Sequence, residues 1–128
     1  MNVAATPAKK ILVVDDEQLL LQGLVKTLQS EGMHIASAES GREALEKIAS
    51  CAYHLCFLDI YLPDMNGLEV LKKIKELSPK TKVIIMTAGI LDKTMEECIE
   101  KHASMYLTKP FDLLQVKMLI RGLIEEEV

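Results

Sequence analysis

Short apolar runs alternate with amphipathic stretches along this sequence, and the alternation limits the possible folds more than any other feature. Lys10–Val14 is typical of the runs: it is rich in β-branched residues, favours a strand and ends abruptly at two aspartates. The stretch from Glu17 to Ser30 follows, with apolar residues at helical spacing: Leu20, Leu21, Leu24, Val25 and Leu28. Each strand is therefore expected to be followed by a helix that packs on the sheet.

Five strand–helix units can be traced in this way. The expected strands are residues 10–14, 34–38, 53–58, 82–86 and 104–108. Helix ends are indicated by residues suited to capping free backbone groups: Gly32, Ser40 with Glu43, Asn66, Asp92, and Asp112 with Gln115. Interleaved helices require parallel strand pairing, because each strand needs a crossover to return to the same edge. We therefore expect an α/β fold with a doubly wound five-stranded parallel sheet in the order 2-1-3-4-5.

Polar residues stand where the expected strands end. In a sheet of this kind, ligands bind outside the carboxyl ends of the strands. The first strand delivers Asp15 and Asp16, followed by Glu17, and the others deliver Asp59, Thr87 and Lys109. Only the second strand ends without such a group, as expected of an edge strand away from the site.

Three carboxylates gathered at one edge would repel one another unless a cation neutralised them. We expect Mg²⁺ (or Mn²⁺) at Asp15, Asp16 and Asp59, because these ions prefer oxygen ligands. Lys109 and Thr87 would supply a fixed positive charge and a hydroxyl group opposite the metal. Such a set suits phosphoryl transfer, in which a carboxylate can act as the nucleophile.

Composition narrows the class of protein. The 128 residues carry 15 Lys and Arg against 19 Asp and Glu, a net charge of −4, which argues against a basic surface for nucleic acid. Three cysteines without CxxC spacing favour a reducing, cytoplasmic location over a disulfide framework or zinc site. Apolar stretches long enough to cross a membrane and a signal peptide are both lacking, so residues 1–8 are expected to be a loose tail.

Four segments together resemble the receiver domain of bacterial two-component response regulators, a flavodoxin-like (βα)5 fold. They are Ile-Leu-Val-Val-Asp15-Asp16-Glu17, Leu58-Asp59-Ile-Tyr-Leu-Pro63-Asp-Met-Asn-Gly67, Ile-Ile-Met-Thr87-Ala88 and Tyr106-Leu-Thr-Lys109-Pro110-Phe111. The resemblance places a receiver domain at residues 9–124 and leaves 125–128 as a C-terminal tail. It implies a signalling switch, not a conventional enzyme, with Mg²⁺-dependent self-phosphorylation and autodephosphorylation.

The resemblance also implies roles around the phosphoacceptor, Asp59. Asp16, Asp59 and the Tyr61 backbone carbonyl would ligate the metal directly, and Asp15 would act largely through a metal-bound water. The phosphoryl oxygens would be held by Lys109, Thr87 and the Ala88 backbone. The Lys109–Pro110 peptide bond would be cis.

Two further pairs of residues concern regulation. The resemblance implies that Thr87 moves toward the phosphoryl group and Tyr106 turns inward behind it, which would reshape the face of the fourth helix, fifth strand and fifth helix. Tyr61 and Gly89 stand two residues after Asp59 and Thr87, and we expect both to tune hydrolysis. Tyr61 places an aromatic ring where many receivers carry a polar side chain, and we expect it to shield the acyl phosphate.

Partners follow from the same resemblance. A sensor histidine kinase, a phosphotransfer protein or a small acyl phosphate would supply the phosphoryl group, and Gln18, Gln22 and Lys26 on the first helix would contribute to pairing. A downstream protein or fused output domain would receive the signal, and a phosphorylation-dependent homodimer is compatible with the sequence. Two-component signalling by this domain would involve neither nucleic acid nor membrane directly.

Other readings are weaker. A haloacid-dehalogenase-type phosphatase needs Asp-x-Asp, but the second position here is Tyr61. A nucleotide-binding module would need a glycine-rich loop after the first strand, where Asp15 and Asp16 stand instead. An EF-hand loop around Asp64 would place Leu62 at the first ligand position. The remaining alternative is a receiver-like scaffold that signals by binding without phosphorylation.

Overall fold

The structure is a computed structural model that describes residues 9–125. The strands are β1 (Lys10–Val14), β2 (His34–Ala38), β3 (Leu55–Asp59), β4 (Lys82–Thr87) and β5 (Met105–Thr108). The helices are α1 (Gln18–Ser30), α2 (Gly41–Ser50), α3 (Gly67–Leu77), α4 (Lys93–His102) and α5 (Leu113–Glu125). The tails expected at residues 1–8 and 126–128 lie outside the described residues.

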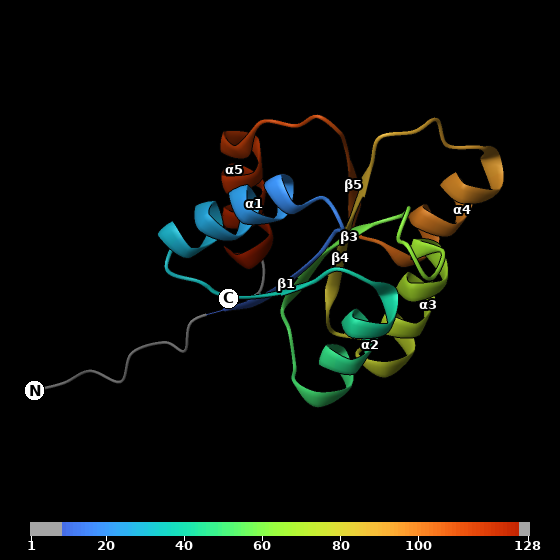
Figure 1. Cartoon of the computed structure of the whole chain (residues 1–128), viewed down its shortest axis with the longest axis horizontal. Coiled ribbons are helices and arrows are strands. Elements are labelled where there is room, and N and C mark those ends of the chain that lie inside the picture. Colours follow the sequence, from blue (N-terminus) through green and yellow to red (C-terminus); the bar gives the residue numbers. More distant parts are fainter. Residues whose placement is uncertain (1–8, 126–128) are drawn as a thin grey trace, which may run out of the picture.

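A single parallel sheet runs through the molecule in the order β2-β1-β3-β4-β5, as the sequence predicts. Figure 1 shows α1 and α5 together on one face of this sheet and α2, α3 and α4 on the other. The register pairs Val14 with Leu58, so Asp15 and Asp59 follow neighbouring positions. The doubly wound arrangement therefore brings the first and third strand ends side by side.

Both faces of the central strands are buried, which explains their nearly continuous apolar sequence. Ile11 and Val13 face the core beneath α1 and α5, and Leu12 and Val14 face the core beneath the other three helices. The predicted α1 stripe is confirmed by its buried leucines, Leu21, Leu24 and Leu28. Burying each such side chain contributes roughly 1.5–3 kcal/mol of transfer free energy. This rigid core fixes the strand ends.

Boundaries differ from the sequence prediction by one or two residues. β3 begins at Leu55 instead of Tyr53, and the Tyr53 carbonyl accepts the Thr81 hydroxyl at 2.7 Å. α5 continues through Glu125, one residue beyond the expected domain end. These shifts leave every strand–helix unit in place.

The predicted caps mostly act as expected. Ser40, Asn66 and Asp92 accept backbone N–H groups at the starts of α2, α3 and α4. Asp112 accepts from the Leu114 N–H at 2.9 Å, so it caps α5 without the reciprocal Gln115 contact expected of a capping box. Gly32 has φ 79°, which suits the residue after the end of α1.

Candidate functional site

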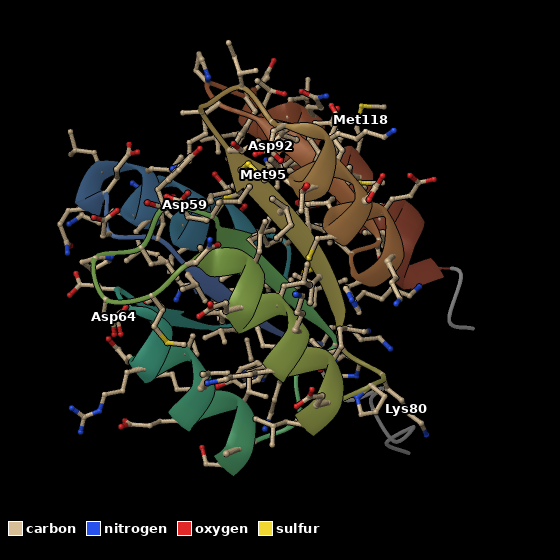
Figure 2. The ribbon with its side chains drawn as sticks, turned by 90° about the vertical axis from the view of Figure 1, so that its right-hand side faces the viewer. Asp59, Asp64, Lys80, Asp92, Met95 and Met118 are labelled. Carbon is tan, nitrogen blue, oxygen red and sulfur yellow. The ribbon has the colours of Figure 1, made fainter. Side chains whose placement is uncertain are left out.

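Asp59 occupies the last position of β3 and is almost completely enclosed, with 4% of its surface exposed. Its Oδ1 accepts the Tyr61 backbone N–H at 3.0 Å, and its Oδ2 lies 3.0 Å from the Lys109 Nζ. One carboxylate oxygen is thus held by the following loop and the other faces a fixed ammonium group. Figure 2 marks Asp59 at the carboxyl edge of the sheet.

Asp15 follows β1 and is fully buried. Its Oδ1 accepts the Glu17 backbone N–H at 2.9 Å, and its Oδ2 lies 2.7 Å from the Lys109 Nζ. Burial raises the pKa of the Asp15 carboxyl above its ordinary value, and the hydrogen bond from Lys109 only partly opposes this effect. The ionised carboxylate is therefore held at a cost in free energy.

Lys109 joins the three acidic residues. It follows β5, and its backbone N–H donates to the Thr87 carbonyl at 2.7 Å, which ties the end of β5 to the end of β4. Its ammonium group contacts Asp15, Asp59 and Glu17, the last at 3.1 Å. Burial lowers the Lys109 pKa, but the hydrogen bonds with the three carboxylates outweigh it and the net pKa is raised. Lys109 is therefore cationic at any physiological pH. The predicted cis Lys109–Pro110 bond is present.

Three carboxylates surround this single ammonium group, which leaves an excess of negative charge. One oxygen each from Asp15, Glu17 and Asp59 lies within 4.8 Å of the others. Asp15 Oδ2 is buried and lies 2.7 Å from the Lys109 Nζ, an ammonium nitrogen that it shares with Asp59 and Glu17. An enclosed acceptor among clustered hard oxygen ligands fits a divalent cation such as Mg²⁺.

Sequence reasoning grouped Asp16, not Glu17, with the other two carboxylates. Asp16 is exposed and is not a member of the cluster, whereas the Glu17 side chain reaches Lys109. Glu17 is the residue before the first turn of α1, and its backbone N–H donates a hydrogen bond to Asp15 Oδ1. The two side chains follow the same strand, so which one joins the cluster depends on this turn.

Thr87 and Ala88 border the cluster at the end of β4. Thr87 is buried, and its Oγ1 accepts the Gly89 backbone N–H at 3.3 Å. Ala88 is exposed and lines a cavity of about 330 Å³ with two residues at the start of α1, Glu17 and Leu20, and three that follow β5, Lys109, Pro110 and Phe111. The cavity gives an incoming group access to the Lys109 side of the site.

Tyr61 and Gly89 meet at the rim, although the sequence offered them only as separate positions. Tyr61 is 55% exposed, and a Cβ atom on Gly89 would lie 3.1 Å from its hydroxyl oxygen. The absence of a side chain at residue 89 thus provides the space in which the Tyr61 ring lies.

Tyr106 lies apart from the acidic cluster. It is 51% exposed on β5 and lines a cavity of about 390 Å³ between α4 and β5. The side chain is therefore in an outward position.

The response regulator receiver domain model matches residues 11–121 of this chain. The chain belongs to the response regulator receiver family. Response regulator RR06 of Streptococcus pneumoniae is 36% identical over 114 residues, which cover 89% of this chain and 52% of RR06. Transcriptional regulatory protein CrdR of Helicobacter pylori is 33% identical over 120 residues, covering 93% of this chain and 56% of CrdR. The receiver thus spans about half the length of these relatives.

Solved structures agree with this assignment. A CheY-like response regulator receiver domain protein from Methanospirillum hungatei superposes with a TM-score of 0.87 at 31% identity, covering 94% of this chain and 98% of that one. Response regulator TrrA from Thermotoga maritima, in complex with Mg²⁺-BeF, gives a TM-score of 0.79 at 37% identity, with coverages of 90% and 98%. The receiver fold predicted from the four sequence segments is confirmed.

Other surfaces of the receiver bear on the predicted partners. Gln18, Gln22 and Lys26 on α1 are all exposed. Among the helices of residues 9–125, none has the length and apolar character needed to cross a membrane.

Proposed function

We propose that this receiver domain is a phosphorylation-activated switch that takes a phosphoryl group onto Asp59. The observation that carries the proposal is the pairing of Asp59 Oδ2 with the Lys109 ammonium at 3.0 Å, inside a cluster of carboxylates. A carboxylate that ends a strand beside a fixed cation is suited to accept a phosphoryl group. Membership of the receiver family supports the same role.

The metal would be Mg²⁺ or Mn²⁺. Asp15, Asp59, the Tyr61 backbone carbonyl and one acidic residue after β1, Asp16 or Glu17, would hold it. When bound, the ion would neutralise charge on the carboxylates and the phosphoryl oxygens. The buried Asp15 Oδ2 and the excess of negative charge support this assignment.

In the transfer step, an Asp59 carboxylate oxygen forms the new P–O bond. The bond from phosphorus to the donor nitrogen or oxygen breaks, and its electron pair leaves with the donor. Lys109 exchanges its contact with Asp59 for the phosphoryl oxygens, which the Thr87 hydroxyl and the Ala88 backbone N–H also bind. Positioning and charge neutralisation supply most of what this reaction requires.

Thr87 and Tyr106 would transmit the change. Movement of Thr87 toward the phosphoryl group would leave room for Tyr106 to turn inward from its exposed position. The face formed by α4, β5 and α5 would then present a different surface to a partner, which makes the domain a two-state switch biased by a local charge. A phosphorylation-dependent homodimer through this face is one outcome.

Tyr61 and Gly89 would set how long the acyl phosphate lasts. The Tyr61 ring lies at the rim against Gly89, where it can limit the approach of water to the phosphoryl group.

A sensor histidine kinase or a phosphotransfer protein would be the donor, with the exposed Gln18, Gln22 and Lys26 contributing to recognition. The receiver unit would occupy residues 9–124, and a downstream protein or a fused output domain would read its state in the cytoplasm. CrdR is named as a transcriptional regulatory protein, and this chain spans about half of it. Regulation of transcription through a separate output unit is therefore the outcome that we favour.

Phosphotransfer from a radiolabelled small acyl phosphate tests the proposal. The wild-type chain should incorporate label with Mg²⁺ and not with a chelator, and Asp59→Asn should lose incorporation. Glu76→Gln serves as a control at an exposed carboxylate on α3 and should retain it. Absence of label in the wild type, with kinase or with acyl phosphate, would favour the scaffold that binds partners without phosphorylation.

A further inference from the structure

The loop of residues 60–66 connects Asp59 to α3 and carries Tyr61. The Tyr61 backbone N–H holds Asp59 Oδ1 at 3.0 Å, and the Tyr61 ring lies against Gly89. Any displacement of this loop therefore moves a contact of the proposed phosphoacceptor, as well as the carbonyl proposed as a metal ligand.

The base of the loop is closed by backbone contacts. Gly67 N–H donates to the Ile60 carbonyl at 2.7 Å, and Tyr61 forms an antiparallel bridge with Asn66. A Cβ atom at residue 67 would lie 2.5 Å from the Ile60 Cα and closer still to the Asp59 carbonyl oxygen. Only glycine permits this closure.

The tip of the loop is attached to a different element, the start of α2. Asp64 Oδ1 accepts the Gly41 N–H at 2.8 Å, and Asp64 Oδ2 accepts the Arg42 N–H at 2.9 Å. Figure 2 shows Asp64 between the loop that leaves β3 and α2. Both carboxylate oxygens are thus used by a helix that begins 23 residues earlier in the chain.

α2 obtains its N-terminal partners from two sources. Its own N-cap, Ser40, accepts the Glu43 N–H at 3.1 Å through the side chain and the Ala44 N–H at 3.0 Å through the carbonyl. The first two N–H groups have no partner within the helix, and Asp64 accepts both. Ser40 therefore acts locally, whereas Asp64 joins the helix to the loop.

A second contact reinforces the attachment. A Cβ atom on Gly41 would lie 2.8 Å from the Met65 Sδ and 2.9 Å from a Val70 methyl carbon. The Met65 side chain occupies the space beside the glycine, directly next to the Asp64 hydrogen bonds. Gly41 thus provides both an N–H for the carboxylate and room for the neighbouring side chain.

Electrostatics favour the same geometry. The hydrogen bonds from the Arg42 and Gly41 backbone N–H groups lower the Asp64 pKa, and the positive end of the α2 dipole favours the carboxylate. Asp64 is therefore ionised at neutral pH. The Asp64 side chain is exposed. It is not a member of the cluster of Asp15, Glu17 and Asp59.

We propose that Asp64 is a positioning residue, which fixes the Tyr61 loop by fastening its tip to the start of α2. The inference rests on the proposed function where it concerns the Tyr61 carbonyl as a metal ligand. The free-energy coupling between the two sites is reciprocal. If the contact between Asp64 and α2 strengthens metal binding, metal binding must strengthen that contact by the same free energy. Metal binding should therefore stabilise the backbone contacts at the start of α2, although α2 does not contact the metal site.

Asp64→Ala, Asp64→Asn and Ser40→Ala form a matched set for the test. Asp64→Ala removes both acceptors, and Asp64→Asn keeps one. Ser40→Ala removes an α2 cap but leaves the loop attachment intact. Amide hydrogen exchange of unphosphorylated protein is measured at Tyr61, Gly67, Gly41 and Arg42, and Mg²⁺ affinity is measured by calorimetric titration.

In Asp64→Ala, exchange at Tyr61 and Gly67 should accelerate and the Mg²⁺ dissociation constant should rise roughly fivefold. This is less than the roughly 10- to 100-fold typical of groups that orient ligand side chains directly. Asp64→Asn should lie between Asp64→Ala and the wild type. Mg²⁺ should slow exchange at Gly41 and Arg42 in the wild type and in Ser40→Ala, but not in Asp64→Ala.

Ser40→Ala should lower the free energy of unfolding by an amount comparable to Asp64→Ala. It should nevertheless leave amide exchange at Tyr61 and the Mg²⁺ affinity unchanged. Equal effects of Ser40→Ala and Asp64→Ala on these two readouts would overturn the proposal, because the stability of α2 alone would then explain them. Unaltered Tyr61 exchange in Asp64→Ala would also overturn it. Amide exchange at Tyr61 tests the attachment of the loop to α2 without any phosphoryl transfer. Failure of the proposed function would instead appear as a lack of label in the phosphotransfer experiment.

Discussion

The Lys109 ammonium nitrogen lies 3.0 Å from Asp59 Oδ2, although the two residues are 50 positions apart in the chain. The same nitrogen also contacts Asp15 at 2.7 Å and Glu17 at 3.1 Å, so one cation faces three carboxylates. The pairing orients the proposed phosphoacceptor, and the uncompensated negative charge would favour binding of a divalent metal ion. The excess of negative charge is therefore a cost to the stability of the metal-free protein.

Replacing Lys109 should increase this cost. Lys109→Gln leaves clustered carboxylates without their cation and should lower the free energy of unfolding by about 3 kcal/mol. Mg²⁺ should restore more stability to this variant than to the wild type, because it replaces the missing charge. Urea unfolding with and without Mg²⁺ measures both effects. Lys101→Gln, at an exposed lysine, should change stability by no more than about 0.5 kcal/mol.

Asp15 should determine how the metal-free protein responds to pH. Its pKa is raised in the folded state above the value of 3.8 that applies without burial. Between pH 3.8 and the raised pKa, the folded protein therefore binds more protons than the unfolded protein. This contribution to stability is fully present below pH 3.8 and is lost as the pH rises through the raised pKa. Asp15→Asn should be more stable than the wild type at pH 7, and should lose stabilisation by Mg²⁺. Equal stability of the two proteins at pH 7 would contradict the assigned cost of burial.

Tyr61 should slow hydrolysis of the acyl phosphate. Tyr61→Asn should accelerate loss of the phosphoryl group by about tenfold, which corresponds to about 1.4 kcal/mol of activation free energy. Tyr61→Phe keeps the ring and should behave like the wild type. Release of labelled phosphate from purified phosphoprotein gives the rates. An unchanged rate in Tyr61→Asn would show that the ring does not shield the site.

Gly67 should be far less tolerant of alanine than Gly122. An added Cβ at Gly67 meets the backbone of Asp59 and Ile60, whereas nothing lies within 4 Å of one at Gly122. Gly67→Ala should lower the free energy of unfolding by more than about 3 kcal/mol, as severe backbone strain does. Gly122→Ala, within α5, should raise it by up to about 1 kcal/mol. Denaturant titration compares them, and similar stabilities would contradict the close approach at Gly67.

The sequence predicted the fold and most strand ends because the relevant signals are local. An apolar run that ends at Asp59 marks both a strand and the group at its tip. Asp15 and Lys109 were found in the same way. Parallel pairing then required these ends to meet at one edge.

Other features depend on geometry that no local pattern carries. The choice between Asp16 and Glu17 is made by the turn that opens α1. Tyr61 and Gly89 were each identified, but their contact joins two loops that approach only in the folded chain. Asp64 looks like an ordinary turn aspartate in the sequence, whereas its hydrogen bond with Gly41 joins residues 23 positions apart.

The most direct test of the central claim is to locate the phosphorylated residue. After incubation with Mg²⁺ and an acyl phosphate, borohydride reduces an aspartyl phosphate to homoserine, which peptide mass spectrometry detects by position. The account predicts homoserine at residue 59 and at no other aspartate, with none formed in the presence of a chelator. Homoserine at Asp15, Asp16 or Asp64, or its absence from residue 59, would contradict the account.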